Sequence, residues 1–124
     1  MKTWSTKELT EVAAADEVEL ATIGRDGTLR RAVTVWVVRS GDDLYVRSWR
    51  GRASTWFRNA HERREGHIHA GGVDRDVAFV EVGTGVQHAI DAAYRTKYRR
   101  YGARYLDPMV SRTARAATVK ILPR

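Results

Sequence analysis

The alternation of hydrophobic and polar positions along the chain predicts β-strands joined mostly by short turns. Six segments fit this pattern: residues 18–24, 31–39, 43–48, 67–70, 77–82 and 118–122. The segment 31–39 is hydrophobic on both faces, so we expect it to be a central strand that is covered on both sides. Asp26-Gly27 and Gly41-Asp42 are turn sequences, which predicts an antiparallel meander of the first three strands.

Helical spacing replaces this alternation in three places. Ser5 and Glu8 form a capping box ahead of a short N-terminal helix. Ser54 is a candidate N-cap for a second helix over residues 54–64, which we expect to end at Gly66.

The longest helix is predicted over residues 86–101, where hydrophobic residues recur every three or four positions. Asp91 and Arg95 lie four residues apart on it, and we expect them to form an ion pair on its surface. Hairpins dominate the resulting order of elements, and no crossover between parallel strands is required. We therefore predict an α+β fold with one domain over residues 1–124, a six-stranded antiparallel β-barrel with flanking helices.

Composition and charge narrow the range of partners. The chain has 124 residues, a formal net charge of +7 and no cysteine, which excludes disulfides and cysteine nucleophiles. The positive charge favours anionic partners such as nucleotides or phosphorylated ligands. Because the basic residues are spread along the chain rather than gathered in a tail, nucleic-acid binding is only a minor alternative. We find neither an apolar segment of membrane-spanning length nor an apolar signal core, so we expect a cytoplasmic protein without a membrane partner.

One stretch concentrates groups that bind anions. Residues 47–56 read Arg-Ser-Trp-Arg-Gly-Arg-Ala-Ser-Thr-Trp and join the third predicted strand to the second predicted helix. Unpaired N–H groups at a helix N-terminus and the forked guanidinium groups of arginine both suit a phosphate. The stretch therefore predicts a phosphate-binding corner, although a solvated arginine turn would explain the same residues.

Residues 22–59 resemble the FMN-binding split-barrel superfamily, which has the pyridoxamine-phosphate-oxidase-like fold. The motifs are Thr-Ile-Gly-Arg-Asp-Gly-Thr-Leu-Arg-Arg at 22–31, Leu-Tyr-Val-Arg-Ser at 44–48 and Trp-Phe-Arg-Asn at 56–59. Within the superfamily, this pattern is similar to the small deazaflavin-dependent nitroreductase-like proteins. The whole chain also resembles an uncharacterised family of small bacterial split-barrel proteins, through residues 93–98, 105–110 and 114–118.

The resemblance implies an oxidoreductase that binds FMN or a deazaflavin and acts on a small organic substrate. It also implies a homodimer, and the hydrophobic residues Val35, Trp36 and Val37 would supply apolar surface for the interface. It implies that the cofactor is held by the corner and by a basic pair before the second strand: Arg30, Arg31, Arg47, Ser48, Trp49, Arg50, Gly51, Arg52, Ser54 and Trp56. This chain departs from the family pattern at two points. Ser54-Thr55 stands where a proline usually precedes the helix tryptophan, and Trp49-Arg50 is bulkier than the small residues common there.

Two further groups are candidates for chemistry. Tyr98 and Tyr101 share a face of the longest predicted helix, and the last helix of the nitroreductase-like proteins contributes tyrosines to the substrate pocket. Core packing is the alternative for them. His69 is a candidate for proton transfer, which is a common role of histidine side chains. His67 and His69 lie two apart on a strand and could bind a metal, but no third ligand is evident in the sequence, so we predict no metal site.

Two other classes of function are compatible with these residues. One is a cofactor-free split barrel that binds a small ligand or catalyses a non-redox rearrangement or cyclisation, which the departures at the corner would favour. The other is a basic nucleic-acid-binding or interaction protein. The visible absorption spectrum of the protein with and without FMN or a deazaflavin would separate them.

Overall fold

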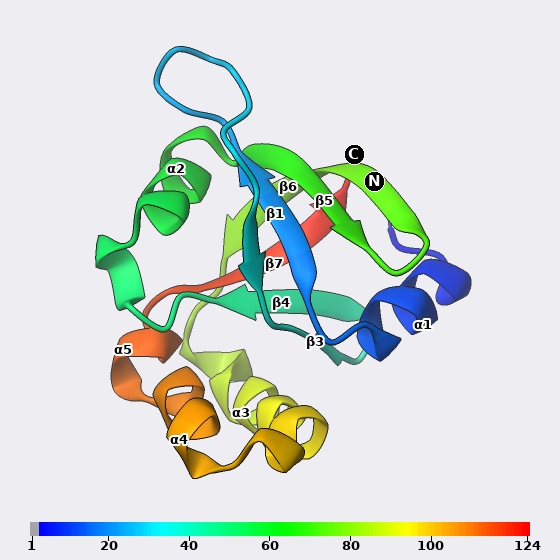
Figure 1. Ribbon diagram of the computed structural model, residues 1–124, viewed down its shortest axis with the longest axis vertical. Helices are drawn as coiled ribbons and strands as arrows, with labels where there is room; N and C mark the ends of the chain where they lie inside the picture. Colours follow the sequence, from blue (N-terminus) through cyan, green and yellow to red (C-terminus); the bar gives the residue numbers. More distant parts are fainter. Residues whose placement is uncertain (1–2) are drawn as a thin grey trace.

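Seven strands form one antiparallel sheet in the computed structural model, which describes residues 3–124 (Figure 1). The strands are β1 (Val18–Thr22), β2 (Val33–Val35), β3 (Val37–Ser40), β4 (Asp43–Arg47), β5 (Glu65–Ala70), β6 (Val73–Glu81) and β7 (Thr118–Pro123). Their order is β2-β1-β5-β6-β7-β4-β3. β2 and β3 stand at the two ends of this order, yet only Trp36 separates them in the chain, so the chain itself closes the sheet into a barrel. The predicted antiparallel barrel with flanking helices is confirmed, with seven strands instead of six.

The additional strand arises from a break at Trp36 inside the predicted strand 31–39. Val37 donates its N–H to the Tyr98 hydroxyl at 3.0 Å, and its carbonyl accepts from the Lys97 ammonium at 2.7 Å. The prediction that this whole segment is covered on both sides was wrong. β2 pairs only with β1, and its Thr34 is exposed. The hydrophobic character of β2 therefore has another cause, which is the cavity described below.

Helices close the barrel and cover one of its outer faces. They are α1 (Thr6–Ala14), α2 (Thr55–Arg63), α3 (Gln87–Tyr98), α4 (Ala103–Leu106) and α5 (Arg112–Arg115). Short 3₁₀ turns lie at Gly51–Ala53, Thr84–Val86, Arg99–Tyr101 and Asp107–Val110. Figure 1 shows α1 at one end of the barrel, α2 near the opposite end, and α3, α4 and α5 grouped below β3 and β4. No helix in residues 3–124 combines the length and the hydropathy needed to cross a membrane.

Both predicted N-caps are confirmed. Ser5 and Glu8 make the reciprocal bonds of a capping box, and the Ser54 hydroxyl accepts from the N–H of Phe57. The predicted end of the second helix was wrong, because α2 ends at Arg63 and Gly66 lies inside β5. A Cβ at Gly66 would lie 2.2 Å from the carbonyl oxygen of Ala21, so glycine allows β5 to approach its neighbour rather than ending a helix.

Two hydrophobic clusters lie on the two faces of β4. Leu44 and Val46 point into the barrel, where they join the larger cluster with residues such as Phe57 and Ile121. Tyr45 points outward and packs with the residues of α3, in the smaller cluster of Val38, Tyr45, Ile90, Tyr94, Tyr98 and Met109. The same alternation directs Arg47 outward, beneath α3. The segment from 84 to 117 is therefore a helical layer packed on the outside of the barrel, and we call it the cap.

Candidate functional site

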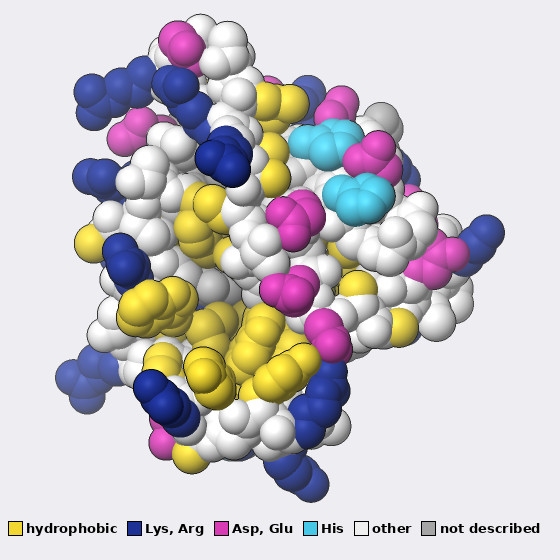
Figure 2. All heavy atoms as spheres, in the orientation of Figure 1, with side chains coloured by type: hydrophobic (Ala, Val, Ile, Leu, Met, Phe, Trp, Pro, Cys, Tyr) yellow, Lys and Arg dark blue, Asp and Glu magenta, His cyan; other side chains and the backbone are white. Residues whose placement is uncertain are grey.

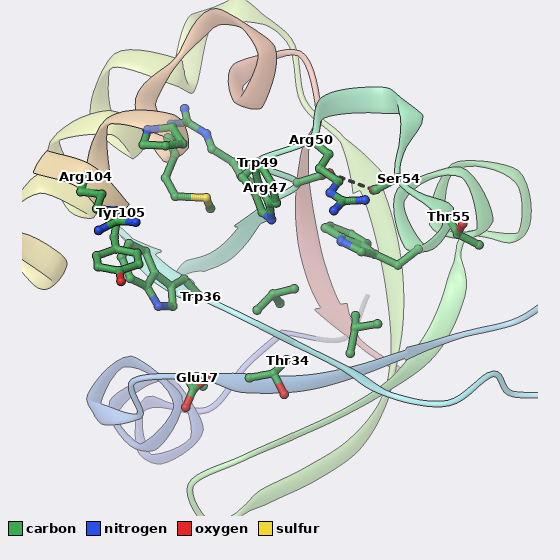
Figure 3. A pocket seen from close by; sticks show the side chains of 16 residues that line it. Glu17, Thr34, Trp36, Arg47, Trp49, Arg50, Ser54, Thr55, Arg104 and Tyr105 are labelled. Carbon is green, nitrogen blue, oxygen red and sulfur yellow. Dashed lines mark hydrogen bonds between the residues drawn. The ribbon is translucent and has the colours of Figure 1, made fainter. Parts of the chain in front are cut away.

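A cavity of about 730 Å³ lies between three parts of the fold. One wall is β2 with Trp36, the second is the corner between β4 and α2, and the third is the cap from α4 to the 3₁₀ turn at Asp107–Val110 (Figure 3). In Figure 2, hydrophobic side chains gather around this hollow and lysine and arginine side chains lie at its edges. The lining residues are Glu17, Val33, Thr34, Val35, Trp36, Arg47, Ser48, Trp49, Arg50, Ser54, Thr55, Trp56, Arg104, Tyr105, Pro108 and Met109.

Internal hydrogen bonds shape the corner between β4 and α2, which lines this cavity. Gly51 adopts φ +74°, which favours glycine, and donates its N–H to the carbonyl of Ser48 at 2.9 Å. The hydroxyl of Ser48 donates to that of Ser54 at 2.8 Å (Figure 3). The first backbone bond of α2 runs from Arg58 to Ser54, so the N–H groups of Thr55 and Trp56 precede it. These features agree with the corner that the sequence predicts.

Arg47, the first residue of the predicted corner, has a different environment. Its side chain is fully buried, and its five N–H groups all have acceptors inside the fold. Nε donates to the Thr118 hydroxyl at 3.0 Å, and Nη1 donates to Asp91 at 2.6 Å and to the Met109 carbonyl at 2.9 Å. Nη2 donates to the side-chain oxygen of Gln87 at 2.6 Å and to its carbonyl at 3.4 Å. Arg47 touches the cavity wall, but no donor is left for a phosphate.

Asp91 is the partner that fixes Arg47, and the predicted surface pair with Arg95 was wrong. Asp91 is buried and accepts from Arg47 and from Arg115, whose Nε lies 2.8 Å away, whereas Arg95 is exposed. Burial by itself raises the pKa of the Asp91 carboxyl, but the bonds from Arg115 and Arg47 outweigh burial and lower it. The carboxylate therefore stays charged and ties α3 to β4 and α5.

The structure brings together some of the predicted cofactor residues and leaves others outside. Ser48, Trp49, Arg50, Ser54 and Trp56 line the cavity, and Gly51 forms the turn beneath them.

Arg30, Arg31 and Arg52 do not line the cavity. Arg30 pairs with Asp26 in the β1–β2 loop at 3.3 Å, and Arg31 is exposed in that loop. Arg52 donates to Glu81 at 2.6 Å.

The three predicted chemical residues also lie outside the cavity lining. Tyr98 is fully buried, stacks on Trp36 with ring centroids 3.9 Å apart, and bonds the backbone of Val37 and Asp16. Burial raises the pKa of the Tyr98 hydroxyl above the ordinary value of a tyrosine. The hydroxyl of Tyr101 donates to Asp16 at 3.1 Å. His69 is exposed on β5, with its Nδ1 3.7 Å from Asp74.

His67 lies between two carboxylates. Its two ring nitrogens lie 2.8 Å from Asp76 and 2.5 Å from Asp74, both on β6. The bonds to Asp76 and Asp74 raise the pKa of His67, because they favour the imidazolium form. Among residues 3–124, no cluster of three or more potential metal ligands occurs.

Sequence reasoning missed most of the β2 and cap residues that line the cavity. The hydrophobic residues of β2 were the sequence feature that could have indicated the cavity. An edge strand that is hydrophobic on both faces must contact something other than its neighbouring strand, and here its residues line the cavity. Tyr105 is 60% exposed at the cavity and does not share the buried environment of Tyr98. Arg104 and Met109 had no signal in the pattern, because the cap reaches the cavity only through tertiary packing.

Comparison with known proteins identifies the family. Residues 8–121 match the family described as an uncharacterized protein conserved in bacteria, DUF2255. The chain belongs to this family. No curated protein matches it.

Solved structures share the fold of this DUF2255 protein at low sequence identity. The heme storage protein HutZ from Vibrio cholerae is 13% identical with a TM-score of 0.67, over 100% of this chain and 92% of that one. An F420-H2 dependent reductase is 19% identical with a TM-score of 0.63, over 86% and 93% of the two chains. A structure described as a domain-swapped dimer is 18% identical with a TM-score of 0.63, over 94% and 92%. These likenesses establish the split-barrel fold.

Proposed function

We propose that the cavity binds FMN or a deazaflavin through its phosphate and that the protein is an oxidoreductase acting on a small organic substrate. The observation that supports this most directly is that one cavity combines aromatic walls with a donor-rich corner. Trp36 and Trp56 supply flat surfaces for a ring system, and Arg50, the Ser54 hydroxyl and the N-terminus of α2 supply donors for a phosphate. The F420-H2 dependent reductase with the same fold adds to this support.

The described residues fit such a cofactor. A volume of about 730 Å³ lies within the range of small-molecule sites and leaves room for a substrate beside the ring. Arg50 would hold the phosphate, with the N–H groups of Thr55 and Trp56 behind it, and Trp36 would contact the ring. A bound flavin or deazaflavin would supply hydride transfer, while the protein positions it and excludes water.

Heme is the competing ligand, because a heme storage protein has the same fold. Among the described residues that line the cavity there is no histidine, and Met109 and Tyr105 are the side chains whose chemistry suits iron ligation. Met109 is fixed by the bond from Arg47 to its carbonyl, and it packs in the smaller hydrophobic cluster. This lining favours the flavin or deazaflavin.

Titration of the purified protein with FMN, riboflavin, F420 and hemin tests the proposal by fluorescence and absorption. We expect FMN or F420 to bind, and FMN to bind more tightly than riboflavin. Arg50→Gln should lower FMN affinity about fivefold, the effect of roughly 1 kcal/mol expected for an exposed charge-assisted contact, and leave riboflavin unchanged. Arg99→Gln is the matched control, because Arg99 is exposed and does not line the cavity. Binding of hemin alone, or equal binding of FMN and riboflavin, would contradict the proposal.

We further propose that the protein is a homodimer. Trp49 and Tyr105 are 58% and 60% exposed beside the cavity, and Leu29 is 57% exposed in the β1–β2 loop. Large aromatic side chains exposed at one site are typical of a protein interface. Val37, which the sequence offered for such an interface, is fully buried in the core of the barrel, so Val35 and Trp36 remain of that group.

A further inference from the structure

We propose that Arg104 is a second anion-binding residue of the cavity and that the substrate is a small organic molecule with a carboxylate. This inference rests on the proposed function, because it places a substrate beside the cofactor in the same cavity. In this proposal the cap selects the substrate, whereas the corner between β4 and α2 holds the phosphate of the cofactor.

The environment of Arg104 carries the inference. Arg104 lies on α4, lines the cavity and is exposed, with its guanidinium carbon 5.9 Å from the ring centroid of Tyr105. Within residues 3–124, its guanidinium has no carboxylate within 4 Å, whereas Arg47, Arg52, Arg100 and Arg115 each have one. A guanidinium that contacts an aromatic ring and has no carboxylate partner keeps its donors available to bind a ligand carboxylate through two parallel bonds.

Among the described residues that line the cavity, Arg50 is the one other arginine without a carboxylate partner. Its guanidinium carbon lies 5.0 Å from the Trp49 ring centroid, and among the described residues it also has no carboxylate within 4 Å. Figure 3 places Arg50 on the side of Ser54, and Arg104 with Tyr105 on the opposite side, next to Trp36. Two free guanidinium groups on opposite sides of one cavity suit two anionic groups. The phosphate would occupy the corner, and the second anion would lie at α4.

Glu17 disfavours an anion on its own side of the cavity. It is the one carboxylate among the described lining residues, and Figure 3 shows it on the side of Thr34, away from the corner. A substrate carboxylate near Glu17 would be repelled, whereas at Arg104 it would be attracted. The aromatic ring of Tyr105 beside Arg104 would contact the apolar part of the substrate. The chemistry that fits is therefore an aromatic or otherwise flat carboxylate.

The experiment uses benzoate and its uncharged analogue benzamide as probes, with and without saturating FMN. Wild-type protein should bind benzoate more tightly than benzamide by about three- to tenfold, and Arg104→Gln should bring this ratio close to one. Arg104→Lys keeps the charge without the fork and should give an intermediate ratio. Arg99→Gln should leave the ratio unchanged, since Arg99 is exposed outside the cavity lining.

The outcomes separate this inference from the proposed function. The ratio of FMN to riboflavin affinity should fall in Arg50→Gln and stay unchanged in Arg104→Gln. If Arg104→Gln lowers that ratio as much as Arg50→Gln does, both arginines hold one phosphate and the inference is overturned. An unchanged benzoate-to-benzamide ratio in Arg104→Gln overturns it as well. A protein that binds neither FMN nor F420 but prefers benzoate through Arg104 would overturn the proposed cofactor and support the second anion site.

Discussion

Replacing Arg47 with methionine should destabilise the protein strongly and should affect ligand binding only through that loss. The Arg47 and Asp91 side chains are 0% and 3% exposed, and five N–H donors of Arg47 have acceptors on β7, α3 and the cap. Removal of one partner of a buried ion pair costs about 3–5 kcal/mol. Arg115 remains beside Asp91, so we expect the lower end, about 3 kcal/mol of the free energy of unfolding.

Urea unfolding followed by circular dichroism measures this effect. A loss of about 3 kcal/mol should lower the unfolding midpoint by roughly 1–3 M, since slopes for small proteins are about 1–3 kcal/mol per M. The double variant Arg47→Met, Asp91→Leu should recover much of the loss, because it leaves no buried charge without its main partner. Arg50→Gln should stay within about 0.5 kcal/mol of wild type, as expected for an exposed side chain.

The result that would refute this reasoning is specific. If Arg47→Met unfolds at the wild-type midpoint but no longer distinguishes FMN from riboflavin, the guanidinium faces the phosphate and not Asp91. A stable variant with normal binding would show that neither role holds.

Two further predictions concern single contacts, at Tyr98 and at His67, and a third concerns the proposed dimer. Tyr98→Phe should lower the free energy of unfolding by about 1–3 kcal/mol in urea, because it leaves the buried N–H of Val37 without its acceptor; lost turnover at unchanged stability would instead indicate a chemical role. For His67, whose folded pKa is raised, the stabilisation is complete below the unfolded pKa of about 6.5 and is lost as pH rises through the folded pKa. The melting temperature of wild type should therefore exceed that of His67→Gln most clearly at acid pH, and a constant difference would exclude the Asp74 and Asp76 contacts as its source. Light scattering at micromolar concentration should report a dimer, and a monomer would remove the proposed interface.

Local patterns were sufficient to predict the barrel. Alternation gave the strands, and turn sequences such as Gly41-Asp42 gave their hairpins, because both signals lie within a few residues of one another. The break at Trp36 could not be predicted in the same way. At this break, the side chains of Tyr98 and Lys97 bond the backbone of Val37. Both residues lie about sixty positions later in the chain, and only the packing of α3 brings them to Val37.

The candidate site was predictable on its corner and not on its cap. Ser48, Arg50 and Ser54 are close in sequence to the start of α2, so a local argument places them together. Arg47 is part of the same stretch, but strand alternation turns it to the opposite face, where Asp91 lies 2.6 Å away. The sequence suggested Arg95 as the partner of Asp91 because helical spacing relates only residues within the same helix. A buried carboxylate between two arginines from other elements leaves no local signature.

The cap supplies one wall of the cavity in this barrel. Structures described as an F420-H2 dependent reductase and as a heme storage protein share the barrel at less than 20% identity, so the barrel alone does not select a ligand. In this protein the cap wall of the cavity carries Arg104, Tyr105 and Met109, and the buried bond from Arg47 to the Met109 carbonyl fixes that wall relative to the corner. We therefore expect changes at the Arg47–Asp91 pair to act on ligand binding only through the stability of the packing between the cap and β4, because the pair touches the cavity wall without offering it a free donor.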